Sequence, residues 1–164
     1  MLPGLGRAVS EGRLSLREAA GLNRELLVAV TDSAVNHLSS AMVLLARHPA
    51  LLDALHEDER LLEPFIEEAL RLESPLPASG GGVGTKPSSP ASRCRPGASC
   101  CSPILRSNRD SDAHAPTDKA DLHRRQPKCH LTCEHGIHFC VGARLARPRE
   151  RGSVLGFAAA RETR

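Results

Sequence analysis

A cysteine in a loop with glycines on both sides is the strongest candidate for chemistry in this chain. Cys140 lies in the sequence His-Gly-Ile-His-Phe-Cys-Val-Gly (135–142), with His138 two positions before it. Helix-forming sequence follows directly, and the N–H groups and dipole of a helix N-terminus stabilise a thiolate. Gly136 permits a tight turn with positive φ, and Gly142 lets a flat group approach the backbone. The loop therefore predicts a reactive or ligating cysteine; a buried cysteine in a turn is the plain alternative.

A long helix is predicted upstream of this loop. Ser15 and Glu18 have the spacing of a capping box, which marks a helix start. No proline interrupts the following pattern before Pro49, so we expect the helix to run to about Arg47. Its apolar residues recur every four positions, at Leu22, Leu26, Val30, Ala34, Leu38 and Met42.

An acid beside an alcohol lies in the middle of this helix. Asp32 and Ser33 follow the apolar residues Ala29 and Val30. An unpaired buried carboxylate is costly, so the pair needs a reason to be there. Either it has a function, or the two side chains face water or bond to the backbone of their own helix.

Two shorter helices are predicted after the long one. The first covers Pro49–Glu57, with proline in its first turn. The second covers Leu61–Leu72 and ends before a Ser-Pro pair. Glu68 and Arg71 lie three residues apart on one face of it. On its own, this spacing indicates a surface ion pair of little energetic value.

The middle of the chain has a different composition. Residues 78–103 are rich in serine, glycine, proline and cysteine, and they show neither a period of two nor one of 3.6. Such a composition is typical of a disordered linker. We therefore divide a single domain of residues 1–164 into a helical part (1–77), this segment (78–103) and a last part (104–164).

Length and composition exclude several classes of function. The 164 residues fit one domain, and a net charge of +3 is too small to predict nucleic-acid binding. No apolar run reaches the length of a membrane span, and the N-terminus is too polar for a signal peptide. The expected location is cytoplasmic, where the six cysteines should be free or ligating. The three aromatic residues are few for such a core, which suggests an incomplete domain.

The cysteine loop resembles the haem-binding loop of the cytochrome P-450 family, bacterial type. That loop reads F-x-x-G-x-H-x-C-x-G, and residues 133–142 match it except at Cys133, which replaces the phenylalanine. Two motifs upstream strengthen the resemblance because they occur in the family's order. One is the acid–alcohol stretch in the long helix, and the other is the E-x-x-R spacing of Glu68 and Arg71.

The two upstream motifs correspond to known parts of that family. The stretch that ends at Asp32 and Ser33 resembles the oxygen-activation motif A-G-x-[DE]-T, with Val30 in place of the glycine and serine in place of the threonine. Glu68 and Arg71 resemble the ion pair that is buried in family members and fixes the cysteine-carrying loop. The resemblance thus implies a structural ion pair where the spacing alone indicates a surface pair.

The resemblance implies a mainly α fold that corresponds to the C-terminal part of the cytochrome P-450 fold, less than half of a full member. Residues 78–103 then form an irregular segment where the family has short β-strands. It also implies a haem cofactor. Haem iron that is held by a thiolate favours cleavage of the O–O bond, which is the chemistry of this family. Cys140 is the implied axial ligand, and the implied haem-binding residues are Gly136, His138, Phe139 and Gly142.

The family's chemistry also implies partners and further roles. Asp32 and Ser33 are expected to relay protons to bound oxygen during hydroxylation of a small-molecule substrate. Electrons are expected from a ferredoxin-type donor, for which four arginines could form a docking face or simply be solvated: Arg124, Arg125, Arg144 and Arg147. With less than half of the family's length, we expect this monooxygenase chain to be weakly active or inactive.

The chain departs from the family pattern at further positions, among them His114 and Ala120, where phenylalanines are usual. Lys119 stands where an arginine should complete the ion-pair network, which puts that network in doubt. Cys133 replaces the phenylalanine that shields the thiolate, and Glu134 replaces a glycine. Pro148 is expected to interrupt the helix that follows the loop.

Two alternatives compete with the haem interpretation. A small zinc module could use sulfur and nitrogen ligands from Cys129, Cys133, His138 and Cys140, although ligands two residues apart crowd one another. A non-functional product of a degraded P-450 gene is the other. The glycine-rich segment, the absent N-terminal half of the family fold and the phenylalanines lost at His114, Ala120 and Cys133 favour it. Replacing Cys133 should weaken zinc binding but not haem ligation.

Overall fold

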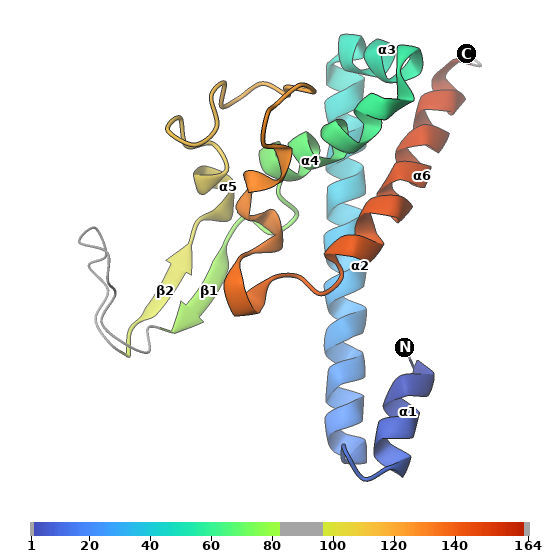
Figure 1. Cartoon of the computed structure of the whole chain (residues 1–164), viewed down its shortest axis with the longest axis vertical. Helices are drawn as coiled ribbons and strands as arrows, with labels where there is room; N and C mark the ends of the chain where they lie inside the picture. The colour runs from blue at the N-terminus through green and yellow to red at the C-terminus, as the bar shows by residue number, and fades with distance from the viewer. Residues whose placement is uncertain (1, 83–96, 163–164) are drawn as a thin grey trace.

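The computed structural model of the protein describes residues 2–82 and 97–162. Figure 1 shows a mainly α chain, as the sequence predicts, with one small pair of strands. Six α-helices are described: α1 (Leu2–Ser10), α2 (Leu16–Arg47), α3 (Pro49–Glu57), α4 (Leu62–Leu72), α5 (Ile104–Ser107) and α6 (Ala143–Glu162). Four single 3₁₀ turns join them: η1 (Glu59–Leu61), η2 (Pro127–Cys129), η3 (Leu131–Cys133) and η4 (Gly136–His138).

The predicted capping box starts the longest helix. The Ser15 hydroxyl accepts a hydrogen bond from the Glu18 N–H at 3.2 Å, and the Glu18 carboxylate accepts one from the Ser15 N–H at 2.8 Å. The helix ends at Arg47, just before Pro49 begins α3. The bounds of α2 and α3 are therefore confirmed, whereas α1, which runs beside the N-terminal end of α2, was not predicted (Figure 1).

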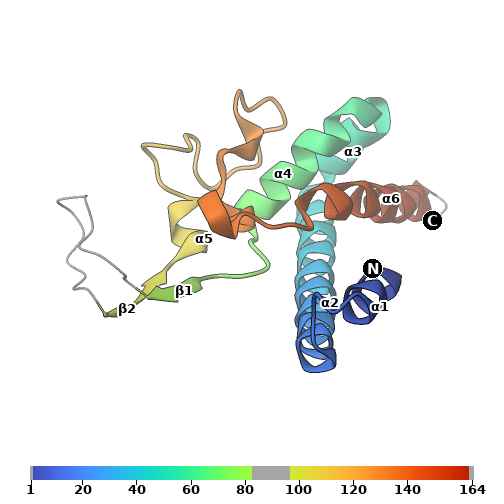
Figure 2. The same ribbon diagram turned by 60° about the horizontal axis from the view of Figure 1, so that its bottom comes forward.

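The core lies where the C-terminal half of α2 meets α3, α4 and α6. Phe65 on α4 is fully buried there, and Val154 and Ala158 on α6 are almost so. Figure 2 shows α6 passing across α2 close to α4. The other buried apolar residues of this cluster are Ala41, Leu45, Leu52, Leu55, Leu62, Ile66, Ala69, Leu70 and Leu122.

The expected interruption at Pro148 is wrong, because α6 runs unbroken through it from Ala143 to Glu162, 20 residues in all. A proline within a helix removes one hydrogen bond, here the bond to the carbonyl of Arg144. Both residues are exposed, so water can satisfy that carbonyl. The helix then gains from the burial of Val154 and Ala158, which offsets the lost bond.

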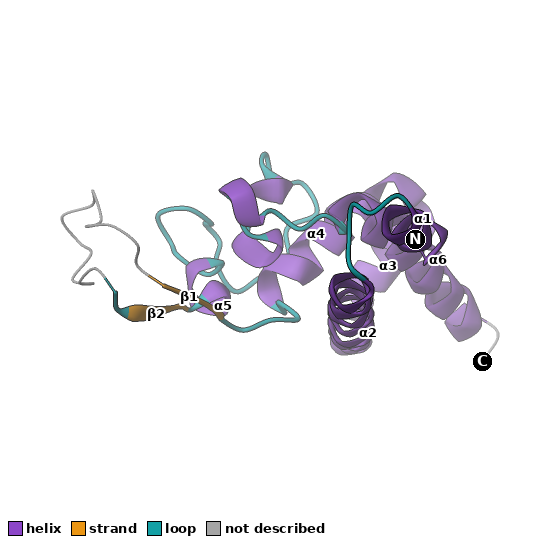
Figure 3. Cartoon of the chain, turned by 90° about the horizontal axis from the view of Figure 1, so that it is seen from below, coloured by secondary structure: helices purple, strands orange, loops and turns teal. Residues whose placement is uncertain are grey.

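Two strands occur at the ends of the segment that was expected to be irregular. β1 (Ser79–Gly82) pairs antiparallel with β2 (Ser99–Ser102), with Ser79 opposite Ser102 (Figure 3). Backbone pairing needs no β-branched side chain, so the absence of a period of two did not exclude it. Residues 83–96 of that segment lie outside the described residues.

The N-terminal half of α2 carries large apolar side chains on its surface. Leu16, Leu27 and Val28 are each more than half exposed, and Leu22 and Val30 are nearly half exposed. By length and composition α2 could cross a membrane, contrary to the expectation that no segment is apolar enough. This is weak evidence for a span, because a core helix of a soluble protein passes the same test.

Candidate functional site

The cysteine loop is held by backbone hydrogen bonds at both ends. The Cys140 N–H donates to the carbonyl of Cys133 at 2.9 Å, and the N–H of Ala143, the first residue of α6, donates to the carbonyl of Cys140 at 3.2 Å. Gly136 has φ +64°, which confirms the predicted positive φ. The cysteine therefore stands at the entrance to a helix on a closed turn.

The surroundings of Cys140 are open and apolar. Its side chain is exposed, and so are those of Ile137 (96%), Phe139 (52%), Val141 (92%) and Leu145 (65%). A methyl group at Gly142 would lie 3.7 Å from the Cys140 sulfur, an ordinary contact, so the backbone at this position runs beside the thiol. Among the described residues, no acceptor binds the N–H groups of Val141 and Gly142. These features suit a flat apolar ligand that covers the side chains and is held through the sulfur.

His138 and the two departures from the family loop occupy different environments. His138 is exposed at the end of η4. Glu134 has φ 55° and ψ −170°, a conformation that is essentially restricted to glycine. Cys133 is half-buried, and burial raises the pKa of its thiol although the nearby Arg147 opposes the shift. Glu134 thus stores backbone strain at the position where the family has glycine.

Glu68 and Arg71 form a buried ion pair on α4. Both side chains are fully buried, and two guanidinium N–H groups donate to the two carboxylate oxygens at 2.9 Å each. The surface ion pair that the spacing alone indicated is therefore not what forms. Arg71 also donates to the backbone carbonyls of Asn108, Thr117 and Lys119. One side chain on α4 thus fixes the segment that leads to the cysteine loop.

The residue that completes this network is Arg124, and not Lys119, which stands at the position of the family's arginine. Its guanidinium donates to the Glu68 carboxylate at 2.7 and 3.3 Å, and its side chain is 8% exposed. The Asp121 N–H donates to the same carboxylate at 2.9 Å. Burial opposes ionisation of Glu68, but these hydrogen bonds outweigh it and lower its pKa. Lys119 itself is exposed, so the doubt it raised about the network is removed.

Glu67 forms a second buried cluster that reaches the cysteine loop. Its carboxylate accepts hydrogen bonds from Arg147 on α6 through both oxygens, and His130 lies 3.0 Å away. The His130 Nδ1 accepts from the Thr132 N–H, so its Nε2 carries the proton and donates to Glu67. Burial disfavours the charge on Glu67, yet the hydrogen bonds from His130 and Arg147 lower its pKa to about 2.

Asn108 links the first network to the same loop. Its side chain is fully buried, accepts from the Leu131 N–H at 2.7 Å and donates to the Thr132 hydroxyl at 3.0 Å. Thr132 in turn donates to the Leu70 carbonyl of α4 at 2.7 Å. Leu131 and Thr132, which directly precede Cys133, are thereby connected to α4, the helix that carries both ion clusters.

The two clusters change the interpretation of the basic residues. Arg124 forms an ion pair with Glu68, and Arg147 forms one with Glu67. These two arginines therefore do not belong to an outward docking face. Arg125 and Arg144 remain exposed. Sequence reasoning missed Glu67, His130 and Asn108 as positioning residues; the only signals were the doubled glutamate before the E-x-x-R spacing and the asparagine beside Arg109.

A third buried polar pair joins α2 to α6. His37 is 2% exposed and its Nε2 lies 3.6 Å from a carboxylate oxygen of Glu150, which is too far for a hydrogen bond. Burial lowers the pKa of His37 to about 4 and raises that of Glu150. His37 is therefore neutral in the fold at mildly acidic pH. The Nδ1 of His37 and one oxygen of Glu150 have no partner among the described residues.

The acid–alcohol pair lies apart from these clusters. Asp32 is exposed and Ser33 is half-buried on the N-terminal side of His37. The Ser33 hydroxyl donates to the carbonyl of Ala29, four residues back in its own helix. Within the described ranges, no hydrogen bond or ion pair joins either side chain to the cysteine loop. The structure thus gathers the loop and the ion pair of α4, but leaves Asp32 and Ser33 on an open helix surface.

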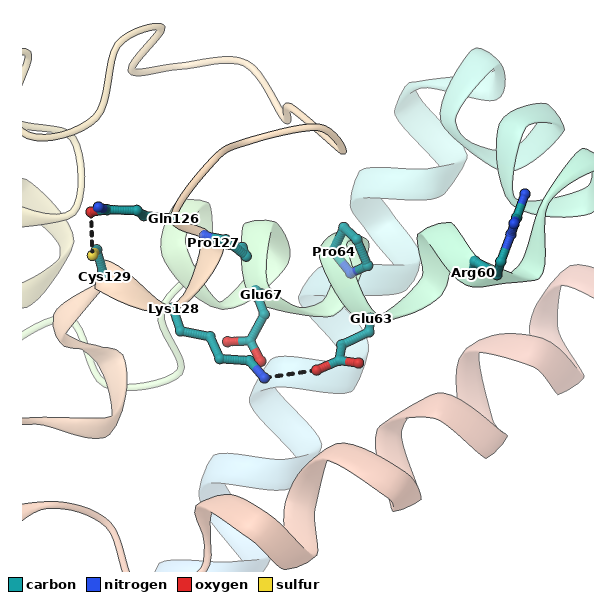
Figure 4. Close-up of a pocket in the computed structure, with 8 residues that line it drawn as sticks. All are labelled: Arg60, Glu63, Pro64, Glu67, Gln126, Pro127, Lys128 and Cys129. Carbon is teal, nitrogen blue, oxygen red and sulfur yellow. Dashed lines mark hydrogen bonds and ion pairs between the residues drawn. The ribbon is translucent and has the colours of Figure 1, made fainter.

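The hollow shown in Figure 4 is not the cysteine site. It has a volume of about 550 Å³ and is lined by residues of η1, α4 and η2, including Cys129 and Glu67 but not Cys140. Lys128 reaches across it to Glu63 at 2.7 Å, an exposed ion pair of little energetic value. In the part of the chain that the structure describes, no three His, Cys, Asp or Glu side chains lie together as a metal site would require. The zinc alternative therefore gains no support.

Comparison with known proteins identifies relatives across most of the chain. No family model matches. The cytochrome P-450 monooxygenase PikC of Streptomyces venezuelae is 35% identical over 147 residues, 87% of this chain and 34% of its own length. The erythromycin C-12 hydroxylase of Saccharopolyspora erythraea is 34% identical over 148 residues, 89% of this chain and 36% of its own length. The chain thus spans about a third of the length of the curated relatives it matches.

Solved structures match the fold as well. A mutant of the P-450 EryK in complex with erythromycin B superposes with a TM-score of 0.78 at 32% identity, over 84% of this chain and 36% of that one. The protein CYP109E1 of Bacillus megaterium, in complex with corticosterone, superposes with a TM-score of 0.82 at 26% identity, over 89% and 39% respectively.

Proposed function

Because this chain is homologous to the cytochrome P-450 family in sequence and in fold, we propose that it carries the haem-thiolate site of a monooxygenase, with Cys140 as the iron ligand. One observation carries the proposal. The exposed thiol of Cys140 stands among exposed apolar side chains, on a loop fixed from behind by two buried ion clusters. A solvent-exposed apolar patch of this kind indicates a binding surface.

The loop residues have distinct parts in this proposal. Cys140 holds the iron, and the unpaired N–H groups of Val141 and Gly142 stabilise negative charge on its sulfur. Ile137 and Phe139 would offer exposed apolar side chains to the macrocycle, and the positive φ of Gly136 makes the tight turn of the loop. His138, exposed beside them, binds a propionate. Thiolate-ligated haem, when bound, supplies the chemistry that cleaves O–O bonds and hydroxylates a substrate.

The ion clusters keep the sulfur where the loop places it. Arg71 holds the carbonyls of three residues in the preceding segment, and Arg147 joins α6 to Glu67 on α4. Buried charges in such pairs cannot be separated cheaply, so both ends of the loop are kept in place. This is a positioning role, since neither carboxylate contacts Cys140 through any described hydrogen bond.

Asp32 and Ser33 are proposed to handle protons on the oxygen-binding side. The Asp32 carboxylate is open to solvent and can take up a proton there. The Ser33 hydroxyl, which donates to the Ala29 carbonyl, still has lone pairs that can accept a proton from a neighbour. Val30 stands where the family has glycine, so we expect this half of the site to be less effective.

The partners follow from the family. We propose a small-molecule substrate, a ferredoxin-type electron donor, and a cytoplasmic location. The relatives insert oxygen, as the name erythromycin C-12 hydroxylase states for one of them. Because the chain spans about a third of their length, we expect weak turnover or none from these residues alone.

A non-functional P-450 product is the alternative that one observation favours. Apolar side chains on the N-terminal half of α2 are left uncovered, and an uncovered apolar surface disfavours a stable, soluble enzyme. The alternative predicts that the chain takes up no haem, whereas our proposal predicts that it does.

The two proposals can be separated by a spectrum. The chain is produced with a haem supply, reduced and exposed to carbon monoxide, and the Soret region is recorded. We expect the red-shifted band that thiolate-ligated haem gives, its loss in Cys140→Ala, and its retention in Cys129→Ala, which removes an equally exposed cysteine outside the loop. A protein without the band, or a band that survives Cys140→Ala, overturns the proposal.

A further inference from the structure

Two cysteines of the site are held next to each other by the backbone. Cys133 ends η3, Cys140 follows η4, and the N–H of the second donates to the carbonyl of the first at 2.9 Å. Because this N–H···O=C bond joins their backbones, the two residues are direct neighbours in space. A disulfide spans Cα separations of roughly 4.4 to 6.8 Å. The turn therefore holds the two cysteines close together in the backbone, as a disulfide between them requires.

The two thiols also differ in a way that suits stepwise oxidation. The Cys140 thiol is exposed, whereas the Cys133 thiol is half-buried. An accessible thiol beside a second, shielded thiol is the arrangement in which a reactive cysteine has a resolving partner. Cys101 and Cys129 do not form such a pair, because both are exposed. The Cys129 thiol also donates a hydrogen bond to the side chain of Gln126.

We propose that Cys133 and Cys140 form a redox-sensitive pair, which a peroxide converts into an intrachain disulfide that withdraws Cys140 from metal ligation. The Cys140 thiolate attacks one peroxide oxygen, the O–O bond breaks, and one water leaves once protonated, giving a sulfenic acid. The Cys133 sulfur then attacks the Cys140 sulfur, the S–O bond breaks, and hydroxide leaves as a second water with the Cys133 proton. Two thiols are oxidised and one peroxide is reduced to two waters.

The disulfide itself does not depend on the proposed haem function, but its consequence does. A sulfur atom bound to another sulfur has no thiolate to offer a metal. The family's phenylalanine at this position has no thiol, so the device belongs to this chain's own residue at position 133. If it operates, oxidised chain binds no haem through Cys140, and reduction restores the binding site.

Peptide mapping of the full, haem-free chain tests the proposal directly. Trypsin releases residues 129–144 as one peptide, because no lysine or arginine lies between Lys128 and Arg144. After treatment with hydrogen peroxide and capping of free thiols, this peptide should be lighter by two hydrogen atoms with only one cysteine capped. Cleavage after Glu134, the only glutamate within it, should leave two peptides joined through their sulfurs.

Matched variants show which thiols are joined. Cys129→Ser should keep the cross-link, while Cys133→Ser should abolish it and leave Cys140 as a sulfenic acid that dimedone traps. Cys133→Phe, which restores an apolar side chain, serves the same purpose if the serine variant fails to fold. Wild-type chain whose Cys133 and Cys140 are both capped after peroxide, or in which either is joined to Cys129, overturns the proposal.

A second measurement separates this proposal from the haem proposal. Peroxide-treated chain, freed of peroxide, should lose the thiolate-type carbon monoxide band and regain it after a dithiol reductant. In Cys133→Phe the band should be lost through a sulfenic acid on Cys140 that dimedone traps, with no cross-link. If the cross-link forms but the untreated chain never gives the band, the haem proposal fails and the redox pair stands. If the band is normal and no cross-link forms, the redox proposal alone fails.

Discussion

Several charged side chains are buried and paired on α4, whereas those on the N-terminal half of α2 are exposed. On α4, Glu67, Glu68 and Arg71 are fully buried, and every charge has a partner from a distant segment. On α2, Asp32 is exposed, and its neighbours Leu27, Val28 and Val35 are apolar side chains left at the surface. Helix α4 is thus saturated with tertiary contacts, whereas this half of α2 has few.

The difference teaches which half of the proposed site the chain supports by itself. The ion clusters tie α4 to the cysteine loop and to α6, so the position of Cys140 is fixed by described residues. The acid–alcohol pair has only helix geometry to position it. Thiolate ligation should therefore be more robust in this chain than proton delivery.

Breaking the α4 network should have the largest effect. Glu68→Ala removes the carboxylate that neutralises Arg71 and Arg124, leaving two buried guanidinium groups without their partner. We expect a loss of roughly 3 to 5 kcal/mol in the free energy of unfolding, or no cooperative folding at all. Urea unfolding followed by circular dichroism measures this. A loss below about 1 kcal/mol, as for a surface pair, would contradict the buried network.

Acid should weaken the α2–α6 contact through His37. Burial lowers its pKa from 6.5 to about 4, so the unfolded chain binds a proton that the fold rejects. The contribution is present above pH 6.5 and is lost as the pH falls toward 4, by up to about 3 kcal/mol.

Other groups modify this pH profile in known directions. The raised pKa of Glu150 gives an opposing slope above pH 4.5, and the lowered pKa of Glu67 adds a further loss between pH 4.5 and about 2. Unfolding measured from pH 7 to 4 should become less steep in His37→Leu and stay unchanged in His123→Gln, which alters an exposed histidine. Equal slopes in His37→Leu and the parent would show that His37 is not buried as described.

Comparing Arg124 with Lys119 sharpens the assignment of the network. Arg124→Ala removes two hydrogen bonds to a buried carboxylate, for which we expect a loss of about 2 kcal/mol. Lys119→Ala changes an exposed side chain and should stay within about 0.5 kcal/mol. Thermal or urea unfolding of the two variants under the same conditions shows which residue stabilises the network. The reverse order of effects would return the role to Lys119.

Glu134→Gly should stabilise the cysteine loop modestly. The residue has φ 55° and ψ −170°, and glycine adopts this conformation without steric cost. We expect a gain of about 1 kcal/mol after the entropy cost of glycine. Glu134→Ala is the control, since alanine keeps the Cβ that causes the strain. An equal gain in both variants would place the benefit in the lost charge and not in the backbone.

Asp32→Asn should have the smallest effect on folding. The carboxylate is exposed and makes no described hydrogen bond, so the free energy of unfolding should change by less than about 0.5 kcal/mol. The same unfolding assay applies. A loss above about 1 kcal/mol would mean that Asp32 is engaged in a folded contact, and that the two regions are less different than described.

Local signals in the sequence predicted the helices well. The capping box at Ser15 and the proline at Pro49 act within a few residues, so they locate the ends of α2 and the start of α3 directly. Pro148 failed as a signal because burial of Val154 and Ala158 offsets one lost hydrogen bond. The strand pair carries no side-chain periodicity, so its residues gave no warning of it.

The partners in the ion clusters could not be predicted in the same way. Arg124 meets Glu68 across 56 positions, and Arg147 meets Glu67 across 80. The path of the intervening loops decides which arginine pairs with each buried glutamate, and no local pattern encodes that path. The cysteine loop was recognisable because its chemistry is local, whereas the support behind it is not.

Iron X-ray absorption on the haem-loaded chain tests the central claim most directly. The account predicts one sulfur scatterer in the first shell of the iron, lost in Cys140→Ser and kept in Cys133→Ser. Glu134→Gly should keep it as well, since it relaxes the loop without touching the thiol. A sulfur shell that survives Cys140→Ser, or a wild-type iron without sulfur, would show that this loop does not hold the haem.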